Sequence, residues 1–235
     1  MYDELRLDLI LKTLAALQRR ISERFPGSGL GHVAAELHGI GEETGPVLAR
    51  IRRPNRLVRG GVGIAIALIV VLGIALFVSI ESVDLGVAGI GPLLETVESA
   101  TQDLIFLAIA IYFLFTLETR LHRRTALRML HRLRSIVHVV DMHQLTKDPE
   151  HLLSPGMATD SSPERVLGRF ELTRYLDYCS ELLSISSKLA AVHVQYVNDP
   201  VVLDAVNDIE VLASNLQNAI WQKIVLVDTV VSAKA

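Results

Sequence analysis

The 21 residues from Gly60 to Ile80 read GGVGIAIALIVVLGIALFVSI and carry no charge, with the hydroxyl of Ser79 as their one strongly polar group. An α-helix rises about 1.5 Å per residue, so a segment of this length matches a hydrocarbon core about 30 Å thick. Nearly sixty residues precede it, and it is longer than the apolar part of a signal peptide. The stretch therefore predicts a membrane-spanning helix that is retained in the protein.

A second apolar run, LIFLAIAIYFLFTL, extends from Leu104 to Leu117 between Asp103 and Glu118. Its 14 residues alone would also suit a buried core helix. Polar residues before it can lie at headgroup depth, and the arginines after it can extend toward water. We therefore expect a second span over residues 101–119.

Basic residues flank both runs, whereas residues 81–100 contain acids and no Lys or Arg. Because Lys and Arg near a span resist translocation, this pattern predicts a hairpin with both termini in the cytoplasm and an acidic loop outside. The sequence shows no amphipathic, Arg- and Ser-rich transit peptide, which favours the plasma (inner) membrane of a bacterium. The charges expected at the membrane interface are Arg52, Arg53, Arg56, Arg59, Asp103, Glu118, Arg120, Arg123 and Arg124. The basic ones are predicted to contact anionic lipid headgroups, and no nucleic-acid partner is expected.

Small residues in the first span form two overlapping pairs, Gly61 with Ala65 and Gly63 with Ala67. Such spacing allows two helices to approach closely. The contact can be made with the second span or with another copy of the chain, and both alternatives stay open at this point.

The segments outside the hairpin, residues 1–59 and 121–235, have helical patterns. In residues 3–24 apolar side chains recur every three or four positions, and Phe25-Pro26-Gly27 ends that helix. We expect a short helix from His32 to Leu37, broken by the glycines of residues 39–45, with Pro46 in a connector to the membrane.

Residues 93–148 contain no Gly or Pro, which predicts one long helix that includes the second span. Its cytoplasmic part has an apolar seam through Leu130, Leu133 and Val137, suited to a coiled coil or a bundle. Ser162-Pro163 and Asp199-Pro200 each place a capping residue before proline, which predicts two more long helices. The predicted fold is all-α: a membrane-anchored helical bundle with a two-helix transmembrane hairpin (residues 60–120) and long cytoplasmic helices.

Potential metal ligands are densest on the long helix, at His131, His138, Asp141 and His143. His193 or Cys179 would have to complete a site. This spacing matches no known zinc or di-iron pattern, and the sequence has no nucleotide-binding, hydrolase or kinase motif. We therefore predict no metal, no cofactor and no catalytic residue.

Three stretches, HVVDMHQLTKDPE (138–150), ELTRYLDYCSELL (171–183) and IWQKI (220–224), resemble an uncharacterised group of bacterial two-span inner-membrane proteins. The resemblance covers about the last 110 residues. It implies an inner-membrane location and no particular activity.

Three functions are compatible with these patterns. The favoured hypothesis is a non-enzymatic membrane protein that self-associates and holds a cytoplasmic protein partner through its helical bundle, because long seams suit helix–helix recognition. The first alternative is an oligomeric channel or membrane-perturbing effector gated by the bundle. The second is a metal-binding protein or enzyme using the face of His131, His138 and Asp141.

Overall fold

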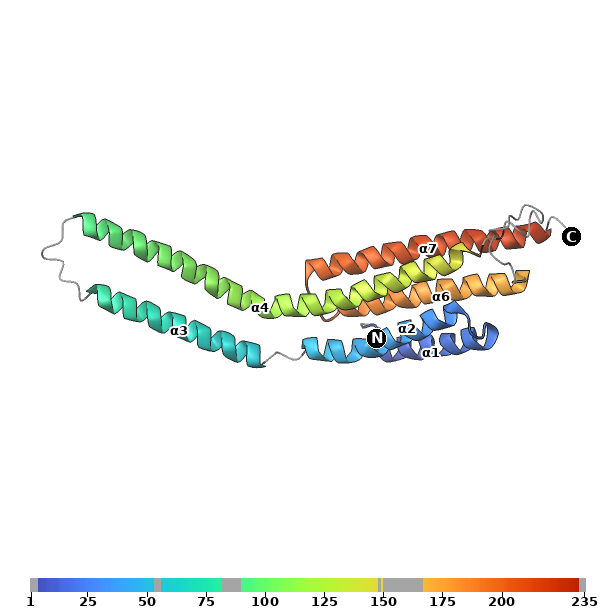
Figure 1. Cartoon of the computed structure of the whole chain (residues 1–235), viewed down its shortest axis with the longest axis horizontal. Helices are drawn as coiled ribbons and strands as arrows, with labels where there is room; N and C mark the ends of the chain where they lie inside the picture. Colours follow the sequence, from blue (N-terminus) through green and yellow to red (C-terminus); the bar gives the residue numbers. More distant parts are fainter. Residues whose placement is uncertain (1–3, 53–55, 82–89, 148, 150–166, 233–235) are drawn as a thin grey trace. The chain divides into compact units, whose positions relative to one another are not determined.

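A computed structural model describes residues 4–52, 56–81, 90–147, 149 and 167–232. These residues form helices and no strand, so the all-α prediction is confirmed for the described part of the chain (Figure 1). The helices are α1 (Leu7–Arg24), α2 (Gly29–Arg52), α3 (Arg56–Glu81), α4 (Ile90–Leu145), α6 (Arg169–Val194) and α7 (Pro200–Ser232).

Contacts divide the chain into two units. Met1–Arg52 and Arg123–Ala235 form one unit, here called the bundle, and Arg53–His122 form the other, here called the apolar unit. Helix α4 contributes to both, since it extends from Ile90 to Leu145 and crosses the boundary between the two units. The segments that precede and follow the expected hairpin therefore fold together rather than as separate domains.

Helix α6 is the central helix of the bundle and contacts α1, α2 and α7. Its buried side chains cover most of its circumference, as expected for a helix surrounded by others. The part of α4 that belongs to the bundle adds Leu130, Leu133 and Val137 to the same core, where each is at most 2% exposed. The helical bundle predicted from the apolar seams is thus confirmed.

Helix α2 continues through the segment that was expected to break it. It includes the glycines of residues 39–45 and also Pro46, so the prediction of a short helix followed by a connector was wrong. Burial explains the difference, because α2 buries an apolar face along its length and this outweighs the poor helix propensity of Gly and Pro. At Gly41 a Cβ atom would lie 2.6 Å from Leu11 Cδ2, so glycine allows α1 to pack closely on α2.

Helix α7 begins where the sequence predicts. Asp199 Oδ1 accepts hydrogen bonds from the backbone N–H groups of Val201 (3.0 Å) and Val202 (3.3 Å), which confirms it as the N-cap. The cap predicted at Ser162-Pro163 lies outside the described residues, and the described part of that helix is α6.

The apolar unit contains α3 and the first part of α4. Judged by length and composition, no single helix among the described residues qualifies as a membrane span, while Gly60–Val71 forms a shorter apolar helix. Two segments of α4, Thr101–Leu114 and Thr119–Leu145, qualify together across a bend.

Candidate functional site

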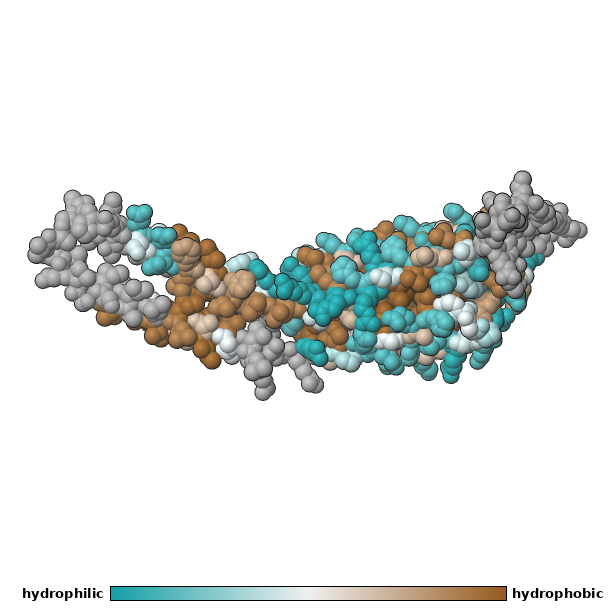
Figure 2. All heavy atoms as spheres, viewed as in Figure 1, coloured by the Kyte–Doolittle hydropathy of each residue, from teal (hydrophilic) through white to brown (hydrophobic). Residues whose placement is uncertain are grey.

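The apolar unit carries an extensive exposed hydrophobic surface. Figure 2 shows hydrophobic side chains gathered over α3 and the first part of α4. In α3, Leu68 is 65% exposed, and in α4 Tyr112 is 67% exposed. Other exposed large side chains of this unit are Ile64, Val70, Val71, Ile74, Val78, Ile105, Phe106, Ile109, Phe113 and Leu121. Among the described residues, the buried hydrophobic core includes none from Arg53 to His122.

The small residues of the first predicted span lie on this open surface. Gly61, Gly63 and Ala67 are exposed, and Ala65 is partly buried. No side chain or other helix lies within 4 Å of a Cβ atom built at Gly61 or Gly63. Within the described chain these glycines therefore make no close helix contact, and a contact with another copy remains a prediction.

Two of the arginines predicted at the membrane interface make side-chain contacts with other residues of the bundle. Arg52 places its guanidinium over the ring of Tyr196, 4.9 Å from the centroid. Arg123 donates from Nε to Asp199 Oδ2 at 2.7 Å. Both side chains thus contact the linker between α6 and α7, and the charge pattern did not indicate these contacts.

The other predicted interface charges lie in α3 and α4, apart from Arg53. Arg120 stacks on Phe113 within α4, at 5.1 Å from the ring centroid. Asp103 and Arg124 are exposed. Arg56, Arg59 and Glu118 are described only as positions in α3 and α4, and Arg53 lies outside the described residues.

The four candidate metal ligands do not converge. His131 and His138 are exposed, Asp141 accepts a hydrogen bond from Gln144 Nε2 at 2.7 Å, and His143 packs against Gly29 of α2. Partial burial and the nearby Lys147 lower the pKa of His143. Within the part of the chain that the structure describes, no three His, Cys, Asp or Glu side chains are placed to hold a metal ion. Cys179 and His193 are residues of α6 whose side chains are buried in the bundle.

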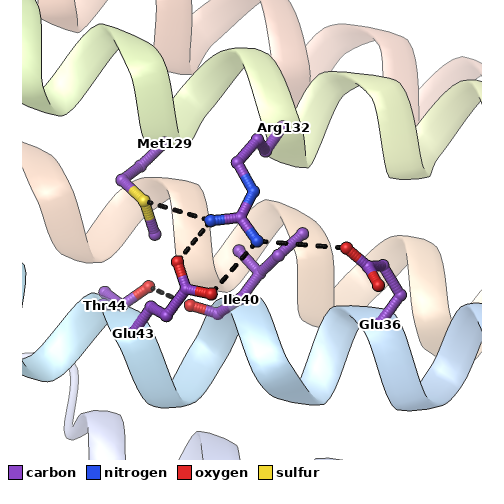
Figure 3. Close-up of polar contacts among 6 residues, drawn as sticks. All are labelled: Glu36, Ile40, Glu43, Thr44, Met129 and Arg132. Atoms are coloured by element: carbon purple, nitrogen blue, oxygen red, sulfur yellow. Dashed lines mark hydrogen bonds and ion pairs between the residues drawn. The ribbon is translucent and has the colours of Figure 1, made fainter.

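A charged contact joins α4 to α2 on the side of the bundle. Figure 3 shows Arg132 reaching from α4 to the two carboxylates of Glu36 and Glu43. Its guanidinium binds both oxygens of Glu43, with Nη2 at 3.2 Å from Oε1, and lies 3.9 Å from Glu36. The pKa of Glu43 is lowered chiefly by its hydrogen bond to Arg132. Because these groups are exposed to solvent, which screens their charges, the pair contributes little to stability.

A second polar contact joins α4 to α7. Lys223 Nζ donates to Gln144 Oε1 at 2.6 Å and to the Gln144 backbone oxygen at 3.2 Å. The side chain of Gln144 is buried, so this bond satisfies polar groups that water cannot reach. Nearby, burial raises the pKa of the Cys179 thiol to about 12, which makes the thiolate rare at neutral pH.

His193 is the one buried side chain among the described residues that leaves a polar atom unpaired. It is fully buried in α6, and its Nδ1 donates to the carbonyl oxygen of Leu189 at 3.0 Å. Its Nε2 is buried and has no hydrogen-bond partner in the described structure. Burial lowers the pKa of this imidazole below 6.5, so the folded bundle holds it neutral.

We expect this histidine to make the bundle less stable in mild acid. The unfolded chain protonates the imidazole near pH 6.5, whereas the folded chain resists protonation until a lower pH. The free energy of unfolding should therefore be highest above pH 6.5 and fall below it by up to about 1.4 kcal/mol per pH unit. Urea unfolding of the detergent-solubilised chain at pH 7.5 and 5.5 measures this loss.

His193→Leu should reduce the acid-dependent loss, and the exposed His131→Leu should leave it unchanged. A loss of equal size in the wild type and in His193→Leu would contradict this assignment. The hydrogen bond from Arg132 lowers the pKa of Glu43, so the titration of this carboxylate should not dominate the comparison.

Sequence patterns signalled Asp199 as a cap but gave no sign of the contacts of Tyr196, Arg123 or Arg132. Those contacts join residues far apart in the chain, and periodicity within a single helix cannot reveal them. No protein-family model, curated protein or solved structure matches this chain.

Proposed function

We propose that this protein is a two-span membrane protein of the bacterial plasma membrane whose cytoplasmic helical bundle acts as a non-enzymatic scaffold. The observation that carries the proposal is the exposed hydrophobic surface of the apolar unit. Both of its helices present large aliphatic or aromatic side chains outward, and the described core includes none of them. Contiguous exposed apolar surface of this kind is rare on proteins that face only water.

Lipid is the environment that best accommodates this surface. Transfer of apolar surface from water gains about 25 cal/mol per Å², and each helix satisfies its own backbone hydrogen bonds. The arginines on either side of the two apolar runs favour a cytoplasmic bundle, with residues 81–100 outside. Among them, the exposed Arg124 is suited to anionic headgroups.

The bundle surface supports a role in protein recognition. Trp221 on α7 is 64% exposed and Met142 on α4 is 67% exposed. Aromatic and Met side chains are enriched at protein interfaces, where their burial contributes much of the affinity. We propose that such positions receive a cytoplasmic partner, while the open faces of Gly61 and Gly63 allow self-association in the membrane. The mass of the detergent-solubilised particle measures the self-association.

Cysteine labelling in intact cells tests the topology. We expect Gly89→Cys, in the acidic loop, to react with a membrane-impermeant maleimide from outside. Ser214→Cys is the matched cytoplasmic position, because Ser214 is an exposed residue of α7 and sulfur replaces oxygen with little change in shape. It should react only after the membrane is permeabilised.

The native Cys179 cannot report topology, since it is fully buried and its thiol pKa is raised. It should stay unlabelled on either side of the membrane and give a low background. Labelling of Ser214→Cys in intact cells, or protection of Gly89→Cys, would contradict the proposed hairpin.

A further inference from the structure

The chain leaves the bundle at one residue and re-enters it at another, and the side chains of both residues contact the same short linker. Arg52 is the last bundle residue before the chain enters the apolar unit, and Arg123 is the first after it returns. Each contacts the linker between α6 and α7, one at Tyr196 and the other at Asp199. We propose that this linker, residues 195–199, is a coupling joint that transmits movement of the membrane helices to the first turn of α7.

The contact of Arg52 holds the beginning of the linker. Its guanidinium lies over the Tyr196 ring, and the backbone N–H of Tyr196 donates to the carbonyl oxygen of His193 at 3.2 Å. Val197, which follows, is buried and donates to the same carbonyl at 3.1 Å. A displacement of the end of α2 is therefore opposed by a linker anchored to α6.

The contact of Arg123 holds the end of the linker through a buried carboxylate. The side chain of Asp199 is 3% exposed, and its Oδ2 lies 2.7 Å from both Nε and Nη2 of Arg123. Its other oxygen, Oδ1, accepts the N–H groups of Val201 and Val202 in α7. The carboxylate thus binds α4 with one oxygen and α7 with the other.

This arrangement makes the two helices move together. A carboxylate is rigid, so a shift of Arg123 that carries Oδ2 with it also displaces Oδ1 from the α7 amides. Separation of Arg123 from Asp199 would leave a buried carboxylate without its cation, which is strongly unfavourable. Helix α4 is continuous from Ile90 to Leu145 and bends between Leu114 and Thr119, so a shift of its membrane part is passed through this bend to Arg123.

The inference rests on the proposed membrane anchoring, and bilayer thickness provides the perturbation. A thicker or thinner bilayer changes the preferred depth or tilt of spanning helices. The full chain is reconstituted into vesicles of short-chain or long-chain phosphatidylcholine, and flotation first establishes that it is inserted. Hydrogen exchange is then measured on peptides that contain the amides of Val201, Val202 and Leu203.

We expect these amides in the wild type to exchange at rates that differ by about threefold or more between the two bilayers. Arg123→Gln should abolish the difference. Asp199→Asn should also abolish it while it keeps an N-cap oxygen, so that loss of coupling is separated from loss of the cap. Arg128→Gln is the matched control, because Arg128 is an exposed arginine of α4 that is not among the predicted interface charges, and it should retain the difference.

Four results are informative. The pattern just described supports the joint. A wild type that floats with both vesicles but exchanges equally in them overturns the joint and leaves membrane anchoring intact, as does an Arg123→Gln variant that keeps the difference. A chain that does not float overturns both proposals.

Discussion

Leu133→Asp is expected to lower the free energy of unfolding of the bundle by about 4 kcal/mol or more. Leu133 is fully buried, in the core to which α1, α2, α6 and α7 also contribute. The substitution removes a packed side chain and places a carboxylate in the hydrophobic core. Urea unfolding followed by circular dichroism, with the chain in detergent, measures the loss.

Met142→Asp is the matched control on the same helix. Met142 is 67% exposed, so its substitution introduces the same carboxylate into solvent. It should change the free energy of unfolding by no more than about 0.5 kcal/mol. If both variants unfold at the same urea concentration as the wild type, the seam of α4 is not a core surface and the described packing is wrong.

Leu68→Arg is expected to disfavour membrane insertion of the first predicted span by about 2.5 to 3.5 kcal/mol. Leu68 is near the middle of the apolar stretch and is 65% exposed within the chain. A helix surface in water tolerates Arg at such a position with little change, whereas hydrocarbon does not. The fraction of the protein that stays in membranes after alkaline carbonate extraction measures the effect.

Leu203→Arg provides the same substitution on the bundle, where Leu203 of α7 is 52% exposed. It should leave membrane retention unchanged. Equal retention of the Leu68→Arg and Leu203→Arg variants would show that the surface of α3 does not face lipid, and the proposed anchoring would fail.

The partners of charged residues between helices could not be predicted from the sequence patterns. The apolar pattern of α4 does not include Arg132, whose guanidinium is held by Glu36 and Glu43 of α2. Arg123 belongs to the basic residues predicted at the membrane interface, and the structure adds an ion pair with Asp199 that the charge pattern did not indicate. A charge pattern predicts the sign of the charge on a helix face. The residue that pairs with each arginine depends on which helices pack side by side.

The sequence by itself determined the features that arise from neighbouring residues. The spacing of apolar residues gave the helical class and the seam of Leu133, and Asp199-Pro200 gave the start of α7, because capping and amphipathic periodicity act within a few residues. Only the tertiary structure decided that α2 continues through Pro46 and that Arg52 and Arg123 meet one linker. Those outcomes depend on burial and on contacts between distant segments, whose free energy exceeds local helix propensity and exists only once the bundle has assembled.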